Sequence, residues 1–169
     1  MKKNLALTGM MGVGKSTIGK AISKQLLMEF IDIDKVIEKK LNSTIPKIFE
    51  QKGEPFFRKI EEKVTLEEVK KSNKVISLGG GAFMNKKIRD CILSNAKSFW
   101  LNINLDLLTK RLNSSKKRPL LINKNTKLTL EKIYQERKST YSLANYKIDC
   151  NNLTSNLIVK KIIKLYENE

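Results

Sequence analysis

The stretch TGMMGVGKST, residues 8–17, constrains the fold more than any other part of the chain. It sets Gly9, Gly14, Lys15 and Ser16 in the pattern G-x-x-x-x-G-K-S, after a short apolar run and before a segment with helical spacing. Glycines permit the positive φ angles and close backbone approach that aim several N–H groups at an anion, and a helix N-terminus adds partial positive charge. The pattern therefore predicts a strand, a phosphate-binding loop and a helix, in that order.

Three side chains of this loop suit a nucleoside triphosphate. Lys15 is long enough to reach the β and γ oxygens as a point charge, the Ser16 hydroxyl can ligate Mg²⁺, and Thr17 is expected near the α-phosphate. The alternative is a glycine-rich turn with an incidental lysine, which leaves the full pattern in this context unexplained. The loop therefore predicts binding of a nucleoside triphosphate.

Short apolar runs alternate with helix-period segments along the chain, which is typical of an α/β domain with a mainly parallel sheet. The predicted strands are residues 4–8, 29–33, 74–78, 97–103 and 146–150. Helical spacing marks the segments that contain Ile18 and Ile22, Phe57 and Val64, Leu105 and Leu112, Ile133 and Tyr141, and Leu157 and Leu165. A further helix is expected to start at Thr44 and Pro46 and to stop at Gly53.

Length and composition predict one domain over residues 1–169, located in the cytoplasm. The 169 residues can bury a core without disulfides or metals. No run reaches the roughly 18 apolar residues of a membrane-spanning helix, and the apolar run after residue 4 is too short for a signal peptide. Cys91 and Cys150 lack histidine partners for a zinc site, so both are expected to be small buried hydrophobes.

The net charge of +17 raises a second class of function, nucleic-acid binding. The lysines are spread along the chain and do not cluster with aromatic residues. A solvated lysine surface therefore explains most of the charge, and part of it is expected to receive an anionic ligand. We expect neither a nucleic-acid nor a membrane partner.

Two aspartates close the strand 29–33, at the edge where a parallel α/β sheet collects its ligands. Asp32 and Asp34, at i and i+2, are expected on one face of an extended segment. A chain without histidine needs a carboxylate to orient a hydroxyl acceptor or take its proton. One aspartate would then face the metal and the other the acceptor, whereas two solvated strand-end aspartates are the alternative.

Three consecutive glycines, Gly79, Gly80 and Gly81, follow the strand 74–78. They are costly in chain entropy and leave no side chain to pack. One explanation is a turn that needs positive φ angles. Another is bare backbone lying close to a small ligand and donating N–H groups to it, and the sequence is compatible with both.

Three arginines stand out in a chain that prefers lysine, because a guanidinium recognises carboxylate or phosphate in a planar, two-pronged way. They are Arg58, Arg118 and Arg137. Arg137 shares the apolar side of its helix with Ile133 and Tyr141, where a charge is expensive unless it is paired. Glu61 lies one turn after Arg58 and is expected to hold it through an i,i+3 pair.

The polar, basic stretch at residues 113–125 has no clear periodicity and is bounded by predicted helices. A stretch of this length within a compact domain favours a functional lid over an idle loop. It contains Arg118, one of the three arginines.

Together these motifs resemble those of the shikimate kinase family, over essentially the whole chain. The matching segments are the phosphate loop, DID (32–34), FFRKIE (56–61), GGG (79–81), RPLL (118–121) and ER…Y (136–141). Their order and spacing make the resemblance specific. It implies a three-layer P-loop kinase fold like that of nucleoside monophosphate kinases, with a mobile lid. It also implies a monomer that phosphorylates the 3-hydroxyl of shikimate with ATP, a step of chorismate and aromatic amino acid biosynthesis.

The resemblance implies three roles on the nucleotide side. Lys15 and the amides of residues 12–17 hold ATP, Ser16 holds Mg²⁺ together with Asp32 acting through water, and Arg111 lies against adenine. Family members often carry Arg or Gln and then Pro after the last strand, and this chain departs from that pattern with CNNLTSN (150–156), in which Asn152 is the candidate for an adenine contact. The nucleotide-binding set is Gly12, Val13, Gly14, Lys15, Ser16, Thr17, Arg111, Arg118 and Asn152.

On the acceptor side, the resemblance implies that Asp34 binds and activates the 3-hydroxyl while Arg58 and Arg137 clamp the carboxylate. Gly80, with its neighbours, contacts the ring hydroxyls, and Arg118 swings in with the lid toward the transferring phosphate. The catalytic set is Lys15, Asp34 and Arg118, and the acceptor-binding region spans about 32–61.

Two alternatives remain at this stage. Another small-molecule kinase of the same fold, acting on gluconate or a nucleoside monophosphate, would share the phosphate loop and lack the combination of FFRKIE, GGG and ER…Y. A nucleic-acid-stimulated ATPase would account for the +17 charge and would show steeply salt-dependent binding.

Overall fold

The apolar run Asn4–Thr8 forms the central strand β1, which is buried along its whole length. A computed structural model describes residues 3–113 and 126–168 and arranges five parallel strands in the order β2-β3-β1-β4-β5. The other strands are β2 (Glu29–Asp32), β3 (Lys74–Ser77), β4 (Ala96–Asn102) and β5 (Tyr146–Asp149). All five predicted strands are confirmed to within one residue at either end.

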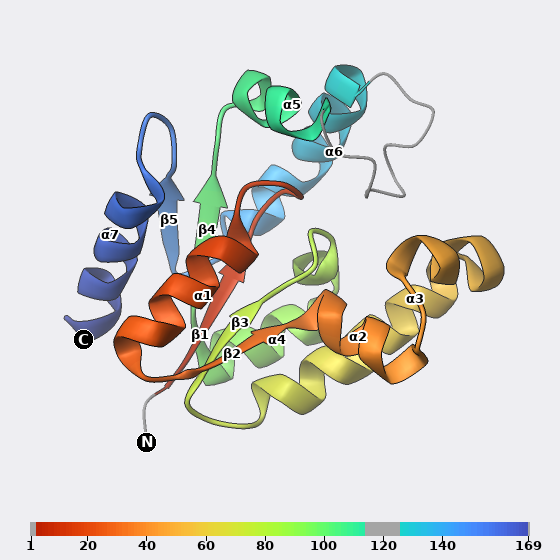
Figure 1. Ribbon diagram of the computed structural model, residues 1–169, viewed down its shortest axis with the longest axis horizontal. Coiled ribbons are helices and arrows are strands. Elements are labelled where there is room, and N and C mark those ends of the chain that lie inside the picture. The colour runs from red at the N-terminus through yellow and green to blue at the C-terminus, as the bar shows by residue number, and fades with distance from the viewer. Residues whose placement is uncertain (1–2, 114–125, 169) are drawn as a thin grey trace.

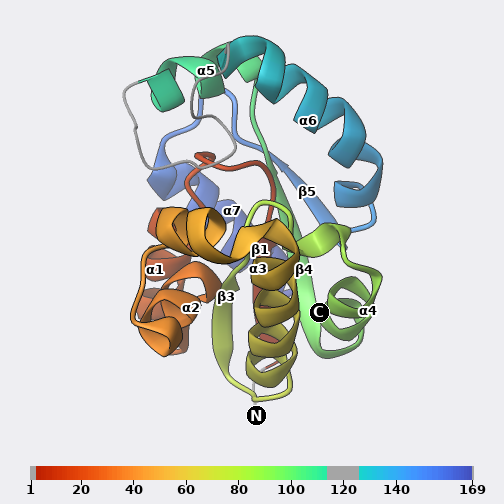
Figure 2. The same cartoon turned by 90° about the vertical axis from the view of Figure 1, so that its right-hand side faces the viewer.

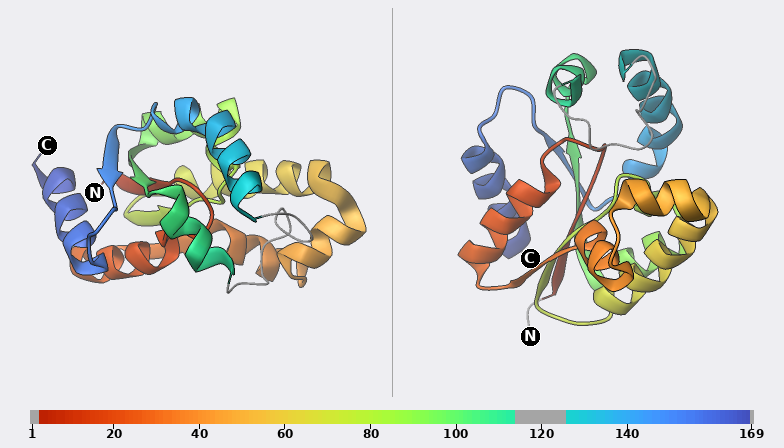
Figure 3. Two further views of the ribbon diagram at one scale, coloured as in Figure 1. Left: turned by 90° about the horizontal axis from the view of Figure 1, so that it is seen from above. Right: turned by 45° about the vertical axis from the view of Figure 1, so that its right-hand side comes forward.

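Helices cover both faces of the sheet, and two more lie over its carboxyl edge (Figure 1). They are α1 (Lys15–Leu26), α2 (Ile33–Leu41), α3 (Ile45–Val69), the 3₁₀ helix η1 (Ala82–Met84), α4 (Lys86–Asn95), α5 (Leu105–Asn113), α6 (Thr126–Tyr141) and α7 (Ser155–Glu167). Helices α1 and α7 pack together on one face, and α3 and α4 on the other (Figure 3). Figure 2 shows α5 and α6 above the edge where the strands end.

The strand order puts two ligand-binding loops side by side. Strand β1 lies between β3 and β4, and Leu7 of β1 pairs with Ser77 of β3. The phosphate loop after β1 and the glycine triplet after β3 therefore leave the sheet at neighbouring positions. This is the point where the chain changes its direction of travel across the sheet, and ligands of open α/β sheets bind there.

Two helices, α2 and α4, were not predicted from the sequence, although both carry local signals. Asp32 caps α2 by accepting a hydrogen bond from the Lys35 amide, and Asn85 caps α4 by accepting from the amides of residues 87 and 88. Ile88 and Ile92, four residues apart, are the buried side of α4. Gly53 interrupts α3 with a φ of 77° and a ψ of 167°, so the predicted stop there is confirmed.

The core fills the space between the sheet and the helices on both faces, with fully buried side chains such as Leu5, Ile76 and Phe99. Cys150 is buried as predicted, whereas Cys91 is only half-buried at the edge of the core. Among the described residues, no helix is long and apolar enough to cross a membrane.

Candidate functional site

The phosphate loop adopts the backbone that its glycines predict. Gly9, Gly12 and Gly14 have φ angles of 135°, 79° and 105°. Gly14 is the N-cap of α1 and has no side chain to occupy the first amides of the helix. Those amides, with the partial positive charge of the helix N-terminus, face a cavity of about 270 Å³ that Gly12, Gly14, Ser16 and Thr17 help to line.

Lys15 lies across this loop and is 8% exposed. Its Nζ donates hydrogen bonds to the carbonyl oxygens of Gly9 at 2.8 Å and Met10 at 2.9 Å. The side chain also lines the phosphate cavity. A lysine held in this way keeps a positive charge beside the cavity with its donors already oriented.

A hydroxyl and a carboxylate suited to a hard cation meet at the floor of the same cavity. Ser16 Oγ donates to Asp32 Oδ2 at 2.5 Å, and Ser77 Oγ lies 3.5 Å from Ser16 Oγ. Asp32 pairs with Ser77 in the register of β2 and β3, which brings the two side chains to one level. Oxygen ligands of this kind fit Mg²⁺, which is usually held by one or two protein groups and the phosphates of its nucleotide. In the described part of the chain, no group of three or more His, Cys, Asp or Glu forms a separate metal site.

The expectation that Asp32 and Asp34 share one face of an extended segment is wrong. The strand β2 ends at Asp32, whose carboxylate caps α2, so Asp34 lies in the first turn of that helix. The cap starts the helix directly after the strand and replaces the two-residue period with a helical one. Even so, both carboxylates line the phosphate cavity and the adjoining larger cavity.

This second cavity, which we call the acceptor cavity, has a volume of about 510 Å³ and adjoins the phosphate loop, which contributes Met11 to its lining. Helix α2, helix α3, the glycine triplet and α6 each contribute lining residues. Its charged members are Asp32, Asp34, Lys35, Glu38, Arg58, Glu61 and Arg137, and its apolar members include Met11, Ile45, Pro46, Phe49 and Phe57. A mixed lining of this kind suits a small polar molecule with an anionic group and an apolar ring face.

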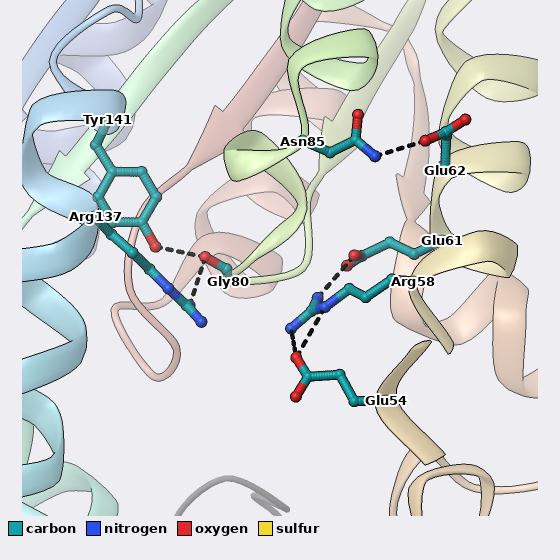
Figure 4. A network of polar contacts seen from close by, with 8 residues as sticks. All are labelled: Glu54, Arg58, Glu61, Glu62, Gly80, Asn85, Arg137 and Tyr141. Atoms are coloured by element: carbon teal, nitrogen blue, oxygen red, sulfur yellow. Dashed lines mark hydrogen bonds and ion pairs between the residues drawn. The ribbon is translucent and has the colours of Figure 1, made fainter. Parts of the chain in front are cut away.

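Arg58 enters the acceptor cavity held by two carboxylates of its own helix (Figure 4). Its Nη1 donates to Glu61 Oε2 at 2.7 Å, and its Nη2 donates to Glu54 Oε1 at 2.9 Å. The predicted i,i+3 pair with Glu61 is thus confirmed. Glu61 is 1% exposed, and burial raises the pKa of its carboxyl while the Arg58 charge opposes that rise.

The glycine triplet is explained by space. None of the three glycines has a positive φ, so the explanation by a positive-φ turn is wrong. A Cβ on Gly79 would lie 2.5 Å from Glu61 Oε1 and 3.1 Å from Asp34 Oδ1, and a Cβ on Gly81 would lie 2.8 Å from Arg58 Nη1. The charged side chains of the cavity therefore pack directly against bare backbone.

Arg137 approaches the triplet from the opposite side. It lies half-buried on α6, and its Nη1 donates to the Gly80 carbonyl at 3.0 Å. Ile133 and Tyr141, on the same side of α6, are buried. The hydrogen bond to Gly80 offsets the cost of placing the Arg137 charge beside them. Figure 4 shows Arg58 and Arg137 on either side of Gly80, one from α3 and one from α6.

Other predicted site residues lie away from the two cavities. Arg111 is exposed on α5, and Asn152 is exposed after β5 with a φ of 53°. Neither lines the phosphate cavity or the acceptor cavity. Arg118 and residues 114–125 of the predicted lid lie outside the described residues, and Asn113 is the last residue of α5.

Sequence reasoning missed several lining residues, among them Ser77, Lys35, Glu38 and Phe49. Lys35 and Glu38 belong to α2, which was not predicted. Phe49 packs against Phe57 with ring centroids 4.8 Å apart, and both rings line the acceptor cavity. Four-residue spacing after the Asp32 cap, from Ile33 to Ile37, would have indicated α2.

Several curated proteins similar to this chain are described as shikimate kinases. A family model described as shikimate kinase matches residues 11–167. A shikimate kinase of Bartonella quintana (strain Toulouse) is 40% identical over 167 residues, which cover 99% of this chain and 80% of the relative. One of Bacillus subtilis (strain 168) is 39% identical over 165 residues, covering 96% of this chain and 88% of the relative.

Solved structures agree with this match. A shikimate kinase from Acinetobacter baumannii in complex with shikimate superposes with a TM-score of 0.94 at 33% identity, covering 98% of this chain and 93% of that one. One from Aquifex aeolicus has a TM-score of 0.84 at 33% identity, covering 98% and 96%. A gluconokinase from Sinorhizobium meliloti 1021 has a TM-score of 0.54 at 16% identity, which shows a common fold alone. The predicted P-loop kinase fold is confirmed.

Proposed function

The chain belongs to the shikimate kinase family, and from this premise we propose how its two cavities divide the work of the reaction. The enzyme is an ATP-dependent kinase that phosphorylates the 3-hydroxyl of shikimate, giving shikimate 3-phosphate and ADP in the biosynthesis of chorismate and the aromatic amino acids. We propose that the phosphate cavity holds ATP and the acceptor cavity holds shikimate. The observation that carries this division is that Ser16, Asp32, Asp34 and Gly80 line both cavities, so the two ligands would meet there.

On the nucleotide side, backbone amides of residues 12–17 hold the phosphates. Gly12 and Gly14 let the backbone approach the phosphates closely, and Val13 and Thr17 add further amides of the same segment. The first turn of α1 faces the anion. Lys15 exchanges its carbonyl partners in the loop for the β and γ oxygens. Its charge then stabilises the negative charge of the phosphoryl group during transfer.

Ser16 and Asp32 hold Mg²⁺, Ser16 directly and Asp32 through water. The support is the pairing of the Ser16 hydroxyl with the Asp32 carboxylate at 2.5 Å beside the phosphate cavity. The ion, when bound, neutralises charge on the phosphate oxygens. Asp32 also caps α2, so one carboxylate fixes the start of the helix that carries Asp34.

On the acceptor side, Asp34 orients the 3-hydroxyl and takes its proton as the oxygen attacks phosphorus. This role of Asp34 is supported by its position in the lining of both cavities, where the acceptor hydroxyl and the phosphate would meet. Arg58 and Arg137 bind the carboxylate of shikimate, since guanidinium groups recognise carboxylates in a two-pronged way. Gly79, Gly80 and Gly81 contact the ring hydroxyls through backbone.

The remaining roles rest on the family resemblance. Arg118 approaches the transferring phosphate as the lid closes and water is excluded, and Arg111 and Asn152 contact adenine. The family resemblance also implies a single-domain enzyme that acts as a monomer. We propose that it works in the cytoplasm.

The first experiment is ADP release by the purified protein with Mg-ATP and a panel of acceptors: shikimate, gluconate, nucleoside monophosphates, nucleic acid and none. We expect release that depends on shikimate, with product phosphorylated at the 3-hydroxyl. Activity with another acceptor and none with shikimate would retain the phosphate-loop assignment and overturn the arginine clamp. Stimulation by nucleic acid alone would favour an ATPase that uses the chain's basic surface.

A further inference from the structure

Tyr141, the last residue of α6, is fully buried, yet its polar end reaches the acceptor site. The ring stacks on Trp100 with centroids 5.9 Å apart, and the hydroxyl donates a hydrogen bond to the Gly80 carbonyl. Burial raises the pKa of Tyr141, which keeps the hydroxyl protonated as a donor. A buried tyrosine must satisfy its hydroxyl, and this one does so on the backbone of the glycine triplet.

The Gly80 carbonyl accepts a second hydrogen bond, from Arg137 Nη1 at 3.0 Å. Both donors come from α6, one turn apart (Figure 4). Glycine has no side chain with which to fix its peptide planes and has the widest backbone freedom. A Cβ at residue 80 would lie 3.3 Å from the Met11 amide nitrogen, so a larger residue would not fit there without a shift. The two hydrogen bonds from α6 therefore help to orient this carbonyl, beside the backbone hydrogen bonds that the carbonyls of Gly79 and Gly81 accept on either side of it.

The orientation of the Gly80 carbonyl also sets the direction of the Gly81 N–H group, which is a hydrogen-bond donor. In a planar trans peptide the C=O of one residue and the N–H of the next point in opposite directions, and no cis peptide occurs in the described chain. With the Gly80 carbonyl directed at α6, the N–H of Gly81 points away from α6. In Figure 4, Arg58 and Glu61 lie on that side, where they line the acceptor cavity.

The two donors differ in what else they do. Arg137 lines the acceptor cavity and is proposed above to bind the carboxylate of shikimate, which draws its guanidinium toward the substrate. Tyr141 is enclosed in the core and does not line that cavity. Its hydroxyl can therefore stay on the Gly80 carbonyl while Arg137 engages the substrate.

We propose that Tyr141 is a positioning residue for shikimate, which acts by holding the Gly80 carbonyl and so the backbone of the glycine triplet. The proposal rests on the residue roles given under "Proposed function". Gly80 also lines the phosphate cavity, and the Tyr141 hydroxyl lies 4.0 Å from Met10 Sδ in the phosphate loop. The proposal therefore predicts a larger effect of the Tyr141 hydroxyl on the acceptor than on the nucleotide, because the amides that hold the phosphates come from a different loop.

The test is Tyr141→Phe, which removes one hydroxyl and keeps the ring in the core. We expect the KM for shikimate to rise about fivefold or more, the effect of losing roughly one neutral hydrogen bond, with the KM for ATP and kcat within about twofold of the parent. Calorimetric titration with shikimate alone should show the same loss of affinity. Tyr134→Phe is the matched control, because it removes a hydroxyl of the same helix that donates to Asn102 Oδ1. It should leave the KM for shikimate unchanged.

Two results would overturn the proposal. One is an unchanged KM for shikimate in a folded Tyr141→Phe variant. The other is an equal rise of both KM values together with a lowered Tm, which would mark a packing role alone. A parent protein with no shikimate-dependent activity would instead overturn the proposed residue roles. Measuring the parent first therefore separates failure of those roles from failure of the Tyr141 proposal.

Discussion

The two halves of the site are built in opposite ways. On the phosphate side, the amides and the lysine proposed to hold the phosphates come from one run of consecutive residues, Gly9 to Thr17, in a loop and the first turn of one helix. The acceptor side gathers Asp34, Arg58, Gly80 and Arg137 from α2, α3, the loop after β3 and α6. The first is specified by local backbone conformation, and the second by how distant elements pack.

This difference has an energetic consequence. A phosphate loop works through backbone N–H groups, a helix terminus and one lysine, which need little support from other elements. The acceptor side depends on buried contacts such as Glu61 with Arg58 and Gly79 against Glu61. Substitutions on the two sides should therefore separate in kinetics: phosphate-side changes act on ATP, and acceptor-side changes act on shikimate.

The largest expected effects come from one residue on each side. Lys15→Ala should lower kcat/KM by at least about 10³-fold, because it removes the charge beside the phosphates. Asp34→Ala should lower kcat by about 10²- to 10⁴-fold, the range for loss of a general base. Initial rates with both substrates varied, and titration of each variant with ATP, measure the effects.

Affinity for ATP distinguishes the phosphate side from the acceptor side. Lys15→Ala should weaken ATP binding, and Asp34→Ala should leave it close to that of the parent. Retained turnover in either variant would refute the role assigned to that residue. Equal loss of ATP affinity in both would show that the two cavities act as one unit.

Smaller effects are expected from a mirrored pair of glycine substitutions. A Cβ on Gly79 would meet Glu61 Oε1 at 2.5 Å, and one on Gly12, where φ is 79°, would meet Leu112 Cδ2 at 2.6 Å. Gly79→Ala should raise the KM for shikimate about tenfold, and Gly12→Ala the KM for ATP by a similar factor, each with about 1–3 kcal/mol lost in stability from overpacking. Steady-state kinetics and thermal unfolding of both variants measure these changes. A higher KM for ATP in Gly79→Ala, or a higher KM for shikimate in Gly12→Ala, in place of the expected change would contradict the division between a phosphate side and an acceptor side.

The same division explains what the sequence could predict. The strands and the loop at residues 8–17 follow from nearby residues, because apolar runs, glycines and a helix start are local patterns. The pair of Arg58 and Glu61 is local too, three residues apart on one helix. Such features could be predicted without knowing how the elements pack.

Features that join distant segments were harder to predict. Nothing near Gly80 in the sequence indicates that its carbonyl accepts hydrogen bonds from residues 137 and 141 on another helix. The triplet was compatible with two explanations, because only the positions of Glu61, Asp34 and Arg58 decide between them. The error over Asp34 has a local cause, since the capping role of Asp32 went unnoticed.

The smallest expected effect concerns the buried partner of Arg58. Glu61→Gln keeps the shape and one acceptor oxygen but removes the charge, so Arg58 is held less firmly. We expect the KM for shikimate to rise about three- to tenfold, in line with loss of a charge-assisted hydrogen bond, while the KM for ATP changes little. Glu54→Gln is the matched control, because Glu54 contacts the same guanidinium from an exposed position, and its effect should be smaller.

The pH dependence of stability gives a second readout of the same pair. Burial raises the pKa of Glu61 in the folded protein above the ordinary value of 4.5, so the folded state binds a proton more tightly than the unfolded state does. Stability from this group is present below pH 4.5 and is lost as the pH rises through the folded pKa. Glu61→Gln lacks this titration, so the Tm of the parent relative to the variant should fall as the pH rises above 4.5. A difference that grows with pH would instead show that attraction to Arg58 outweighs burial, and that this acceptor-side charge stabilises the fold as well as the site.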